Sequence, residues 1–330
     1  QVTEIMVNGP DNIFVERGGR LYKSDLKFEN GEKLQNVVQQ IVSDCNRVVN
    51  EASPIVDARL QNGARVNVVL NPVALNGPIL TIRRFPDKPI TMENLISFGS
   101  VTSQVCEWLG RLVKAKYNIF ISGGTGSGKT TFLNALSHYI PAEERIITIE
   151  DSAELQICSI PNLVRMETRN ANVEGCQEIT IRDLIKTSLR MRPDRIIVGE
   201  VRGGEAFDMM QCLNTGHDGS MSTGHANSST DMLSRLENMI LMGMEIPLDA
   251  IRQQIASGID IIVHLGRLRD KSRKVLEIVE VLGFAEGKIQ LKPLYQFTET
   301  GEDAEGRVQG ELVKKGELTY VEKLQSAGLC

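Results

Sequence analysis

The sequence predicts an α/β protein preceded by a smaller α+β domain, and three observations lead to that prediction. An apolar strand at residues 118–122 runs into a glycine-rich loop, and the loop opens an amphipathic helix. Two further apolar stretches, 145–150 and 196–200, each end in an acid, and helical patterns separate the strands along the chain. Before residue 85 the pattern changes to short alternating stretches around one amphipathic helix, which indicates a separate domain.

Residues 1–84 are expected to form the smaller domain around an antiparallel sheet. Ile5 and Val7 alternate before an Asn-Gly-Pro-Asp turn, and a pair of short strands is expected after that turn. Two more strands are expected at 65–70 and 79–83. Between these stretches, apolar residues at helical spacing predict a helix that packs on the sheet: Leu34, Val37, Val38, Ile41, Val42 and Cys45.

Residues 85–101 are expected to link the two domains, because the segment Phe85-Pro86-Asp87-Lys88-Pro89 is bracketed by prolines. A helix is expected from 91 to about 116, leading into the strand before the glycine loop. Arg83 and Arg84 close the last strand before the linker. Two adjacent arginines there either form a solvated strand end or fold over a triphosphate and stabilise transition-state charge, as an arginine finger does.

The glycine loop matches the phosphate-binding pattern G-x-x-x-x-G-K-[ST] completely, and it has the strand–loop–helix context that confirms the pattern. Its glycines let consecutive N–H groups converge on phosphate oxygens, and the following helix adds its positive N-terminal end. Lys129 is expected to reach the β- and γ-phosphates of ATP, and the Thr130 hydroxyl to ligate Mg²⁺. The residues expected to bind nucleotide are Gly123, Gly124, Thr125, Gly126, Ser127, Gly128, Lys129, Thr130 and Thr131.

Acidic residues follow the next two buried strands. Glu150, Asp151 and Glu154 lie at the carboxyl end of the first, where an α/β sheet places its ligand chemistry. They either orient water or metal, or they cap the following loop. Glu200 ends the second strand in a Walker-B arrangement, with glutamate in place of aspartate. Because glutamate reaches one methylene further, Glu200 suits a contact to Mg²⁺ through water or the activation of an attacking water.

A polar stretch after these strands offers a second kind of phosphate contact. Ser222, Thr223 and His225 stand at the end of an expected fourth strand, where they could hydrogen-bond a γ-phosphate and report its presence. His217 and His264 are expected to be structural hydrogen-bonding residues instead. The remaining expected elements are helices at 180–191 (capped by Thr180 and Asp183), 233–240 and 251–255, strands at 261–265 and 275–281, and an acidic surface loop or flexible segment at 298–306.

Length, composition and charge limit the classes of protein to which this chain can belong. The chain has 330 residues, 41% of them hydrophobic and 24% charged, which suits two globular domains. It shows neither an apolar run long enough for a transmembrane helix nor a secretory signal, so a cytoplasmic location is expected. The six scattered cysteines lack zinc spacing and are expected to be reduced thiols. A net charge of −5 offers no overall attraction to nucleic acid.

Four signatures occur in one order along the chain: the phosphate loop, Thr148–Glu154, Val198–Gly203 and Ser222–Asn227. With them the chain resembles the type II/type IV secretion traffic ATPases, in which the last three motifs are called the Asp box, Walker B and His box. The resemblance continues through four N-terminal stretches and so covers nearly the whole chain: 4–9, 54–60, 63–66 and 80–85. This fuller pattern is most similar to the CpaF-like ATPases of tight-adherence (Tad/Flp) pilus assembly. Ser152 and Ala153 depart from the wider superfamily, which often has proline and an apolar residue there, and that affects loop shape rather than chemistry.

The resemblance implies a fold and an assembly. Residues 1–84 would form a PAS-like domain and residues 102–330 a RecA-like ATPase domain, joined by a mobile linker, with nucleotide bound between them. The chain would act as a cytoplasmic homohexamer at the inner face of the cytoplasmic membrane, on a membrane platform protein. No nucleic-acid partner is expected.

The resemblance also implies residue roles. Lys129 and Thr130 would serve the phosphates and Mg²⁺, Glu150 would be the general base and Glu200 the Walker-B acid. The other implied roles are His225 as the γ-phosphate sensor and Arg83 as the N-domain arginine at the nucleotide, with Arg84, Arg145 and Arg202 as weaker candidates.

The expected function is hydrolysis of ATP with Mg²⁺ by a hexameric motor that drives pilus assembly or protein secretion. A RecA-like nucleic-acid motor would share the phosphate loop and the ring, but it should respond to DNA or RNA. A small-molecule kinase would need an arginine-bearing lid, and the sequence offers no candidate for one. A nucleotide-gated switch with negligible turnover also stays open.

Overall fold

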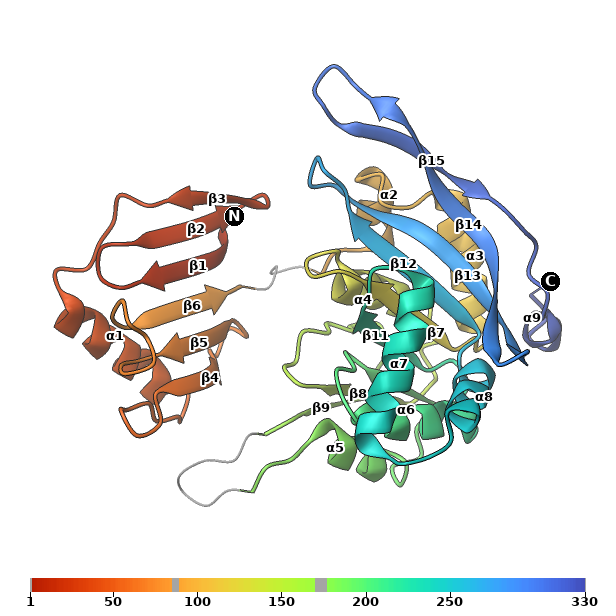
Figure 1. Cartoon of the computed structure of the whole chain (residues 1–330), viewed down its shortest axis with the longest axis horizontal. Coiled ribbons are helices and arrows are strands. Elements are labelled where there is room, and N and C mark those ends of the chain that lie inside the picture. Colours follow the sequence, from red (N-terminus) through yellow and green to blue (C-terminus); the bar gives the residue numbers. More distant parts are fainter. Residues whose placement is uncertain (1, 85–88, 170–176, 330) are drawn as a thin grey trace. The chain divides into compact units, whose positions relative to one another are not determined.

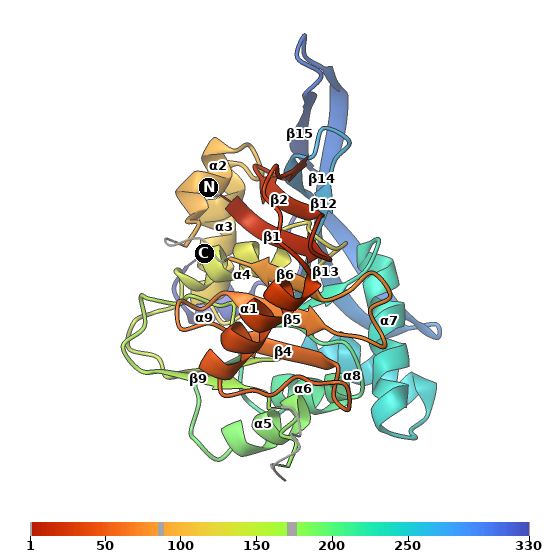
Figure 2. The ribbon, with the colours of Figure 1, turned by 90° about the vertical axis from the view of Figure 1, so that its left-hand side faces the viewer.

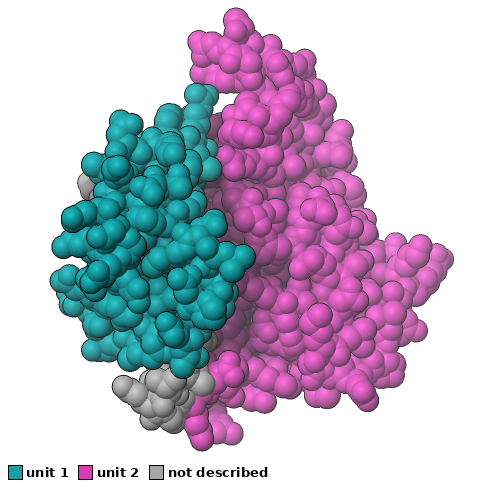
Figure 3. Space-filling model, turned by 60° about the vertical axis from the view of Figure 1, so that its left-hand side comes forward, with its two compact units in different colours: residues 1–88 teal, residues 89–330 magenta. Residues whose placement is uncertain are grey.

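The chain divides into two compact units in the computed structural model, which describes residues 2–84, 89–169 and 177–329. Unit 1 comprises Gln1–Lys88 and unit 2 comprises Pro89–Cys330, as coloured in Figure 3. Unit 1 has one hydrophobic core and unit 2 has two, on opposite faces of its sheet. Each unit is therefore described by itself.

Unit 1 is a six-stranded sheet with one helix packed on it. Every strand pair in it is antiparallel, which confirms the predicted small antiparallel sheet. The helix α1 (Gly31–Asp44) buries Leu34, Val38 and Val42 completely against the sheet, as its spacing predicted. In spatial order the strands are β3 (Arg20–Lys23), β2 (Ile13–Arg17), β1 (Val2–Asn8), β6 (Ile79–Arg83), β5 (Arg65–Val69) and β4 (Ile55–Arg59).

Unit 2 is built on a nine-stranded mixed sheet (Figure 1). Six neighbouring strands are parallel, in the order β12 (Ile261–Arg267), β7 (Ile119–Gly123), β11 (Met221–His225), β10 (Arg195–Val198), β8 (Ile146–Glu150) and β9 (Leu163–Glu167). Three antiparallel strands extend the sheet beyond β12, namely β13 (Arg273–Ala285), β14 (Lys288–Glu302) and β15 (Val308–Lys314). The predicted α/β class is confirmed.

Helices cover both faces of the unit 2 sheet, because its central strands are apolar on both sides. Ile119 and Ile121 of β7 belong to one buried cluster, whereas Phe120 between them belongs to the other. The first face carries α2 (Met92–Ser97), α3 (Ser103–Lys114), α4 (Lys129–Ser137) and α9 (Glu322–Ser326). The second face carries α5 (Ile181–Ser188), α6 (Glu205–Asn214), α7 (Ser229–Gly243) and α8 (Leu248–Gly258).

Two expectations from the sequence need correction. The helix predicted over 91–116 is two helices, because the chain turns after α2 at Gly99, whose φ of 67° is left-handed. The stretch 298–306 is not simply a surface loop, since β14 continues to Glu302 and only a short turn separates it from β15. Glu299 and Glu302 are neutralised by ion pairs with Arg269, so the acidic strand is stable in this hairpin, which Figures 1 and 2 show extending from the sheet.

The C-terminal segment is packed onto unit 2. Both oxygens of the buried Glu280 carboxylate accept the Thr319 N–H, at 3.0 and 2.8 Å, and one of them also accepts the Tyr320 N–H at 2.7 Å. The Tyr117 hydroxyl donates to the Tyr320 carbonyl at 2.6 Å. Leu324 of α9 then enters the same hydrophobic cluster as the inner face of α3. The last residues therefore complete the core on this face of the sheet.

Candidate functional site

The parallel strands bring the predicted functional residues of unit 2 to one edge of the sheet. β7 leads into the phosphate loop, β8 ends at Glu150, and β11 ends at His225. Glu200 lies two residues beyond the end of β10. Because β11, β10 and β8 are successive neighbours of β7, all four carboxyl ends open onto the same place. This is where doubly wound sheets bind ligands.

The phosphate loop has the geometry that its glycines predict. Gly128 is the residue before α4 and has a φ of 94°, which favours glycine, and Lys129 begins the helix. Gly123 is held against β12, because a Cβ there would lie 2.4 Å from the Leu265 carbonyl oxygen. Thr130 and Thr131 follow in the first turn of α4, so their backbone N–H groups belong to the positive end of the helix.

Lys129 is folded back into the loop. Its side chain is 7% exposed, and Nζ donates to the Gly124 carbonyl at 3.1 Å. Nζ also lies 3.1 Å from Nδ1 of His225. Desolvation lowers the pKa of Lys129, and the nearby Glu200 carboxylate partly offsets this. The buried ammonium group therefore contacts neutral partners, a carbonyl oxygen and a ring nitrogen. A charged phosphate oxygen would form a stronger hydrogen bond with it.

His225 joins the lysine to the acid that follows β10. Its Nε2 is 2.7 Å from Oε1 of Glu200. Burial, followed by the charge of Lys129, lowers the pKa of His225, so the ring is neutral at pH 7. A neutral ring that accepts from Lys129 at Nδ1 carries its proton on Nε2, the nitrogen that lies against Glu200.

Arg202 extends this chain of polar contacts beyond Glu200. Its guanidinium contacts Oε2 of Glu200 at 2.6 Å and Asp151 at 3.3 Å. The Asp151 carboxylate also accepts from the Thr168 hydroxyl at 3.0 Å. Asp151, which the sequence placed among three acids for water or metal, is therefore already occupied by protein donors.

Glu150 is a buried carboxylate of this edge that keeps an open oxygen. It is 2% exposed, and its Oε2 accepts the N–H groups of Glu154 at 2.6 Å and Leu155 at 2.9 Å. Its Oε1 is buried and has no hydrogen-bond partner among the described residues. Burial raises the pKa of Glu150 to about 7, although the two backbone hydrogen bonds act in the opposite direction. Gly199 packs against this side chain, since a Cβ there would lie 2.9 Å from Cγ of Glu150.

The oxygen groups of this edge suit a hard cation such as Mg²⁺. Magnesium is held by one or two protein oxygens together with waters and substrate phosphates. The hydroxyl of Thr130 and the carboxylate of Glu200 are such oxygens, and the unsatisfied Oε1 of Glu150 adds acceptor capacity nearby. Within the described ranges no cluster of three or more His, Cys, Asp or Glu side chains forms an all-protein metal cage. That pattern fits a metal bound jointly with nucleotide.

Other residues named from the sequence lie apart from this edge or are occupied by the fold. Arg83, the last residue of β6, and Arg84 belong to unit 1, so their contribution stays a prediction. Arg145 precedes β8 at its opposite end, where Nε donates to the Met191 carbonyl at 2.9 Å. The Thr223 hydroxyl donates to the Gly199 carbonyl at 2.7 Å, which leaves it no role at a phosphate. His264 is the structural residue expected, with Nδ1 2.6 Å from the buried Ser122 hydroxyl.

The sequence did not single out Arg273, which reaches the phosphate loop from β13. Its Nε donates to the Gly126 carbonyl at 2.8 Å. One signal could have found it: the strand predicted at 261–265 ends at the same edge as the loop, and the next strand returns from there. A basic residue at the start of that returning strand is placed to meet the loop.

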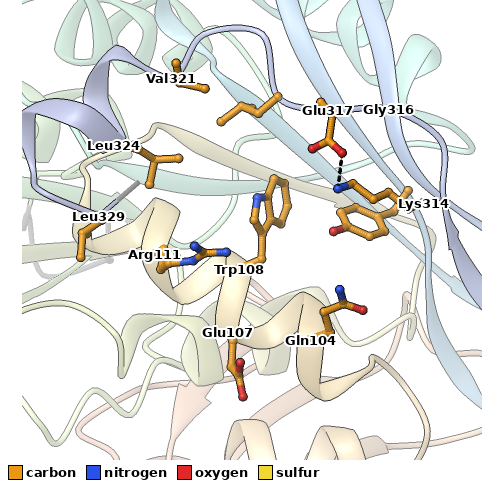
Figure 4. Close-up of a pocket in the computed structure, with 12 residues that line it drawn as sticks. Gln104, Glu107, Trp108, Arg111, Lys314, Gly316, Glu317, Val321, Leu324 and Leu329 are labelled. Carbon is orange, nitrogen blue, oxygen red and sulfur yellow. Dashed lines mark hydrogen bonds and ion pairs between the residues drawn. The ribbon is translucent and has the colours of Figure 1, made fainter.

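A cavity of about 730 Å³ lies elsewhere in unit 2, between α3 and the C-terminal segment (Figure 4). Trp108 and Arg111 enter it from α3, and Tyr295 lies beside Trp108 with its ring centroid 5.3 Å away. Lys314 and Glu317 on its rim form an ion pair. None of the predicted nucleotide-site residues lines this cavity.

The fold and the phosphate loop together define a P-loop protein with a RecA-like α/β domain. Comparison with known proteins gives the family: residues 1–310 match the model for type II/IV secretion system proteins. The chain therefore belongs to that family of secretion ATPases.

Two relatives and one solved structure illustrate the similarity. The type IV secretion system protein VirB11 of Brucella suis is 32% identical over 295 residues, covering 80% of this chain and 81% of VirB11. The conjugal transfer protein TrbB of Rhizobium radiobacter is 31% identical over 301 residues, covering 90% of this chain and 89% of TrbB. The crystal structure of the pilus retraction motor PilT with bound ADP shares the fold, with a TM-score of 0.56 at 16% identity, covering 99% of this chain and 83% of PilT.

Proposed function

We propose that this protein hydrolyses ATP with Mg²⁺ as a hexameric motor, and that the motor drives pilus assembly or protein secretion through an inner-membrane platform protein. The observation that carries the proposal is the chain of close contacts from Lys129 through His225 to Glu200, beside the buried Glu150, whose Oε1 has no hydrogen-bond partner among the described residues. It supports the proposal because a cation, an imidazole ring and a carboxylate with an open oxygen lie together at one edge of the sheet. Membership of the secretion family supports the cellular role.

The phosphate loop binds the β- and γ-phosphates in this mechanism. Lys129 leaves the Gly124 carbonyl and pairs with phosphate oxygens, while N–H groups of the loop and of the first turn of α4 donate to them. Thr130 and Glu200 would hold Mg²⁺, which when bound neutralises charge on the phosphates. The other steps belong to side chains of the chain itself.

Glu150 acts as the general base. With a pKa of about 7 it is partly ionised at neutral pH, and its open Oε1 can accept a proton from an attacking water. A base whose pKa lies near the working pH is the most effective. The two backbone N–H groups on Oε2 fix the direction in which the open oxygen faces.

His225 reports the state of the nucleotide. When Lys129 turns to the phosphates, Nδ1 of the ring loses its donor, and once Nδ1 binds a proton it can donate to the γ-phosphate. Arg83 of unit 1 supplies a second contact to the nucleotide, by resemblance to the secretion ATPases. Loss of the γ-phosphate would break both contacts and free unit 1 to rotate, which is a known mode of hinge switching.

Membership of the family supports the proposed cellular setting. No helix of the part of the chain that the structure describes is long and apolar enough to cross a bilayer. We propose a cytoplasmic protein held peripherally at the inner face of the cytoplasmic membrane by its platform partner. The CpaF-like branch of tight-adherence pilus assembly is the proposed branch, since the motif pattern of the N-terminal 85 residues agrees with it.

Hydrolysis of Mg²⁺-ATP by size-separated protein tests this function. Wild type, Glu150→Gln and Lys129→Ala are compared with and without single-stranded DNA. We expect a ring-sized species that turns over ATP independently of DNA, and loss of activity in both variants. Strong stimulation by DNA would favour a nucleic-acid motor instead. Full activity of a monomer carrying Glu150→Gln would favour a different reaction class.

A further inference from the structure

Two arginines of the antiparallel extension border the phosphate loop. β12 runs parallel to β7 and continues past its end, and Arg267 is paired in register with Arg273 of β13. Nε of Arg273 donates to the Gly126 carbonyl at 2.8 Å. A Cβ built on Gly126 would lie 3.9 Å from Nη1 of Arg267, and one on Gly128 would lie 3.4 Å from Cδ of Arg273. Both guanidinium groups therefore lie at the loop.

The pairing of these two arginines is electrostatically unfavourable by itself. Like charges directly opposite each other on neighbouring strands destabilise a sheet. Both side chains are exposed, so water screens part of this cost. An anion bound in the loop beside the two arginines lowers the local positive potential and so reduces the repulsion between them.

The bond from Arg273 also fixes the orientation of one peptide plane of the loop. In a planar trans peptide, the carbonyl oxygen and the next N–H point in opposite directions. Holding the Gly126 carbonyl toward Arg273 therefore turns the Ser127 N–H the other way. That N–H is directed at the Gly124 carbonyl, 3.3 Å away, which is the same oxygen that Lys129 contacts. Ser127 N–H and Lys129 Nζ thus both point at the Gly124 carbonyl oxygen, and a bound phosphate oxygen would replace that oxygen as their acceptor.

We propose that Arg273 is a positioning residue of the phosphate loop: it sets the Gly126–Ser127 peptide plane so that the Ser127 N–H faces the bound phosphate. Arg267 adds positive charge at the same place. This inference rests on the proposed function only in that the loop binds a nucleotide.

The affinities of this protein for ADP and AMP, measured by calorimetry, test this role. The variants are Arg273→Ala, Arg273→Lys, Arg267→Ala and Lys129→Ala. Arg269→Ala is the matched control, because it removes the same charge from the same β12–β13 connection, where Arg269 pairs with Glu299 and Glu302. Thermal unfolding of each variant shows whether it is folded.

A directed hydrogen bond predicts a particular pattern. Arg273→Ala should weaken ADP binding roughly tenfold or more, which is the scale of a charge-assisted hydrogen bond. Arg273→Lys should fail to restore it, since lysine lacks the fixed guanidinium geometry. The ratio of ADP to AMP affinity should fall, because AMP has no β-phosphate for the loop to hold. Arg267→Ala should cause a smaller, salt-dependent loss, and Arg269→Ala none.

Three results would overturn the inference. They are an ADP affinity in Arg273→Ala equal to that of Arg269→Ala, full rescue by Arg273→Lys, and an unchanged ratio of ADP to AMP affinity. If Lys129→Ala weakens ADP binding while Arg273→Ala does not, only the role of Arg273 fails. If Lys129→Ala also leaves ADP binding intact, the loop is not the nucleotide site and the proposed function fails with it.

Discussion

Nδ1 of His225 lies 3.1 Å from Nζ of Lys129, so the lysine of the phosphate loop is hydrogen-bonded to the last residue of the neighbouring strand β11. Burial lowers the pKa of both groups. Nε2, on the other side of the same neutral ring, lies 2.7 Å from Oε1 of Glu200. A phosphate that draws Lys129 away therefore changes the hydrogen bonding of His225, and through it that of Glu200.

Replacing His225 should remove the discrimination between ATP and ADP. In His225→Ala, affinity for a non-hydrolysable ATP analogue should fall relative to ADP by roughly 5- to 150-fold, the usual range of coupling between two sites. Turnover should fall as well. Equilibrium binding of both nucleotides measures the ratio. His217→Ala is the control, because His217 contacts the Cys212 carbonyl at the far end of α6. Unchanged discrimination in His225→Ala would rule out the sensor.

Glu150 should make turnover depend on pH. Because burial raises its pKa to about 7, the ionised base becomes abundant only as the pH rises through that value. The rate of ATP hydrolysis should therefore increase between about pH 6 and about pH 8. Glu150→Gln should abolish turnover over the whole range. A flat profile in the wild-type protein would show that another group accepts the proton.

The Glu150 carboxyl should also make the stability of the fold depend on pH. Stability should decrease over the same pH range in which turnover increases. Since its folded pKa lies above the ordinary value of 4.5, the folded state holds the proton more tightly than the unfolded state. This contribution is fully present below about pH 4.5 and is lost as the pH rises through about 7, on the order of 3 kcal/mol in all. The Tm of Glu150→Gln relative to wild type should thus increase from pH 5 to pH 8. The exposed Glu143, changed to Gln, should show no such trend.

Much of the fold could be predicted because three of its central strands, β7, β8 and β10, are apolar runs that lead into glycine or acid. β7, β8, β10 and β11 all lie where the pattern placed them. Strands whose residues alternate with charges were missed, such as β9 at the edge of the sheet, which contains Arg165 and Glu167. Such strands are stabilised by their neighbours rather than by their own hydrophobicity.

Within the site, the sequence revealed the groups but not their contacts. The glycine pattern identified the phosphate loop, and strand ends identified Glu150, Glu200 and His225. The bond between His225 and Lys129 joins residues 96 apart, and the bond between Arg273 and Gly126 joins residues 147 apart. Such contacts depend on strand order and register, which local patterns do not specify.

Gly199 should prove essential for the position of Glu150. A Cβ at this residue would lie 2.9 Å from Cγ and 3.5 Å from Oε2 of Glu150, so Gly199→Ala must displace the carboxylate. We expect turnover to fall about 100-fold, as a shift of about 1 Å in a reacting group can cause. Stability should fall by about 1–3 kcal/mol. Steady-state hydrolysis and thermal unfolding measure the two effects.

A glycine in open space provides the control for Gly199. A Cβ on Gly31, at the start of α1, would meet no atom within 4 Å, and Gly31→Ala should leave both turnover and stability nearly unchanged. If Gly199→Ala hydrolyses ATP like wild type, then Glu150 tolerates displacement. It would then not be the base.

Arg83→Ala should separate catalysis from binding. Arg83 is the exposed last residue of β6, and we propose that it stabilises charge on the phosphates in the transition state. Arginine fingers contribute roughly 10³-fold or more to turnover. Because the interaction strengthens in the transition state, kcat should fall by about that factor while the affinity for ADP changes little. Arg17→Ala, also at an exposed strand end of unit 1, removes the same charge and should be active. If Arg83→Ala and Arg17→Ala turn over ATP equally, Arg83 does not contact the nucleotide, and Arg84→Ala then tests its neighbour.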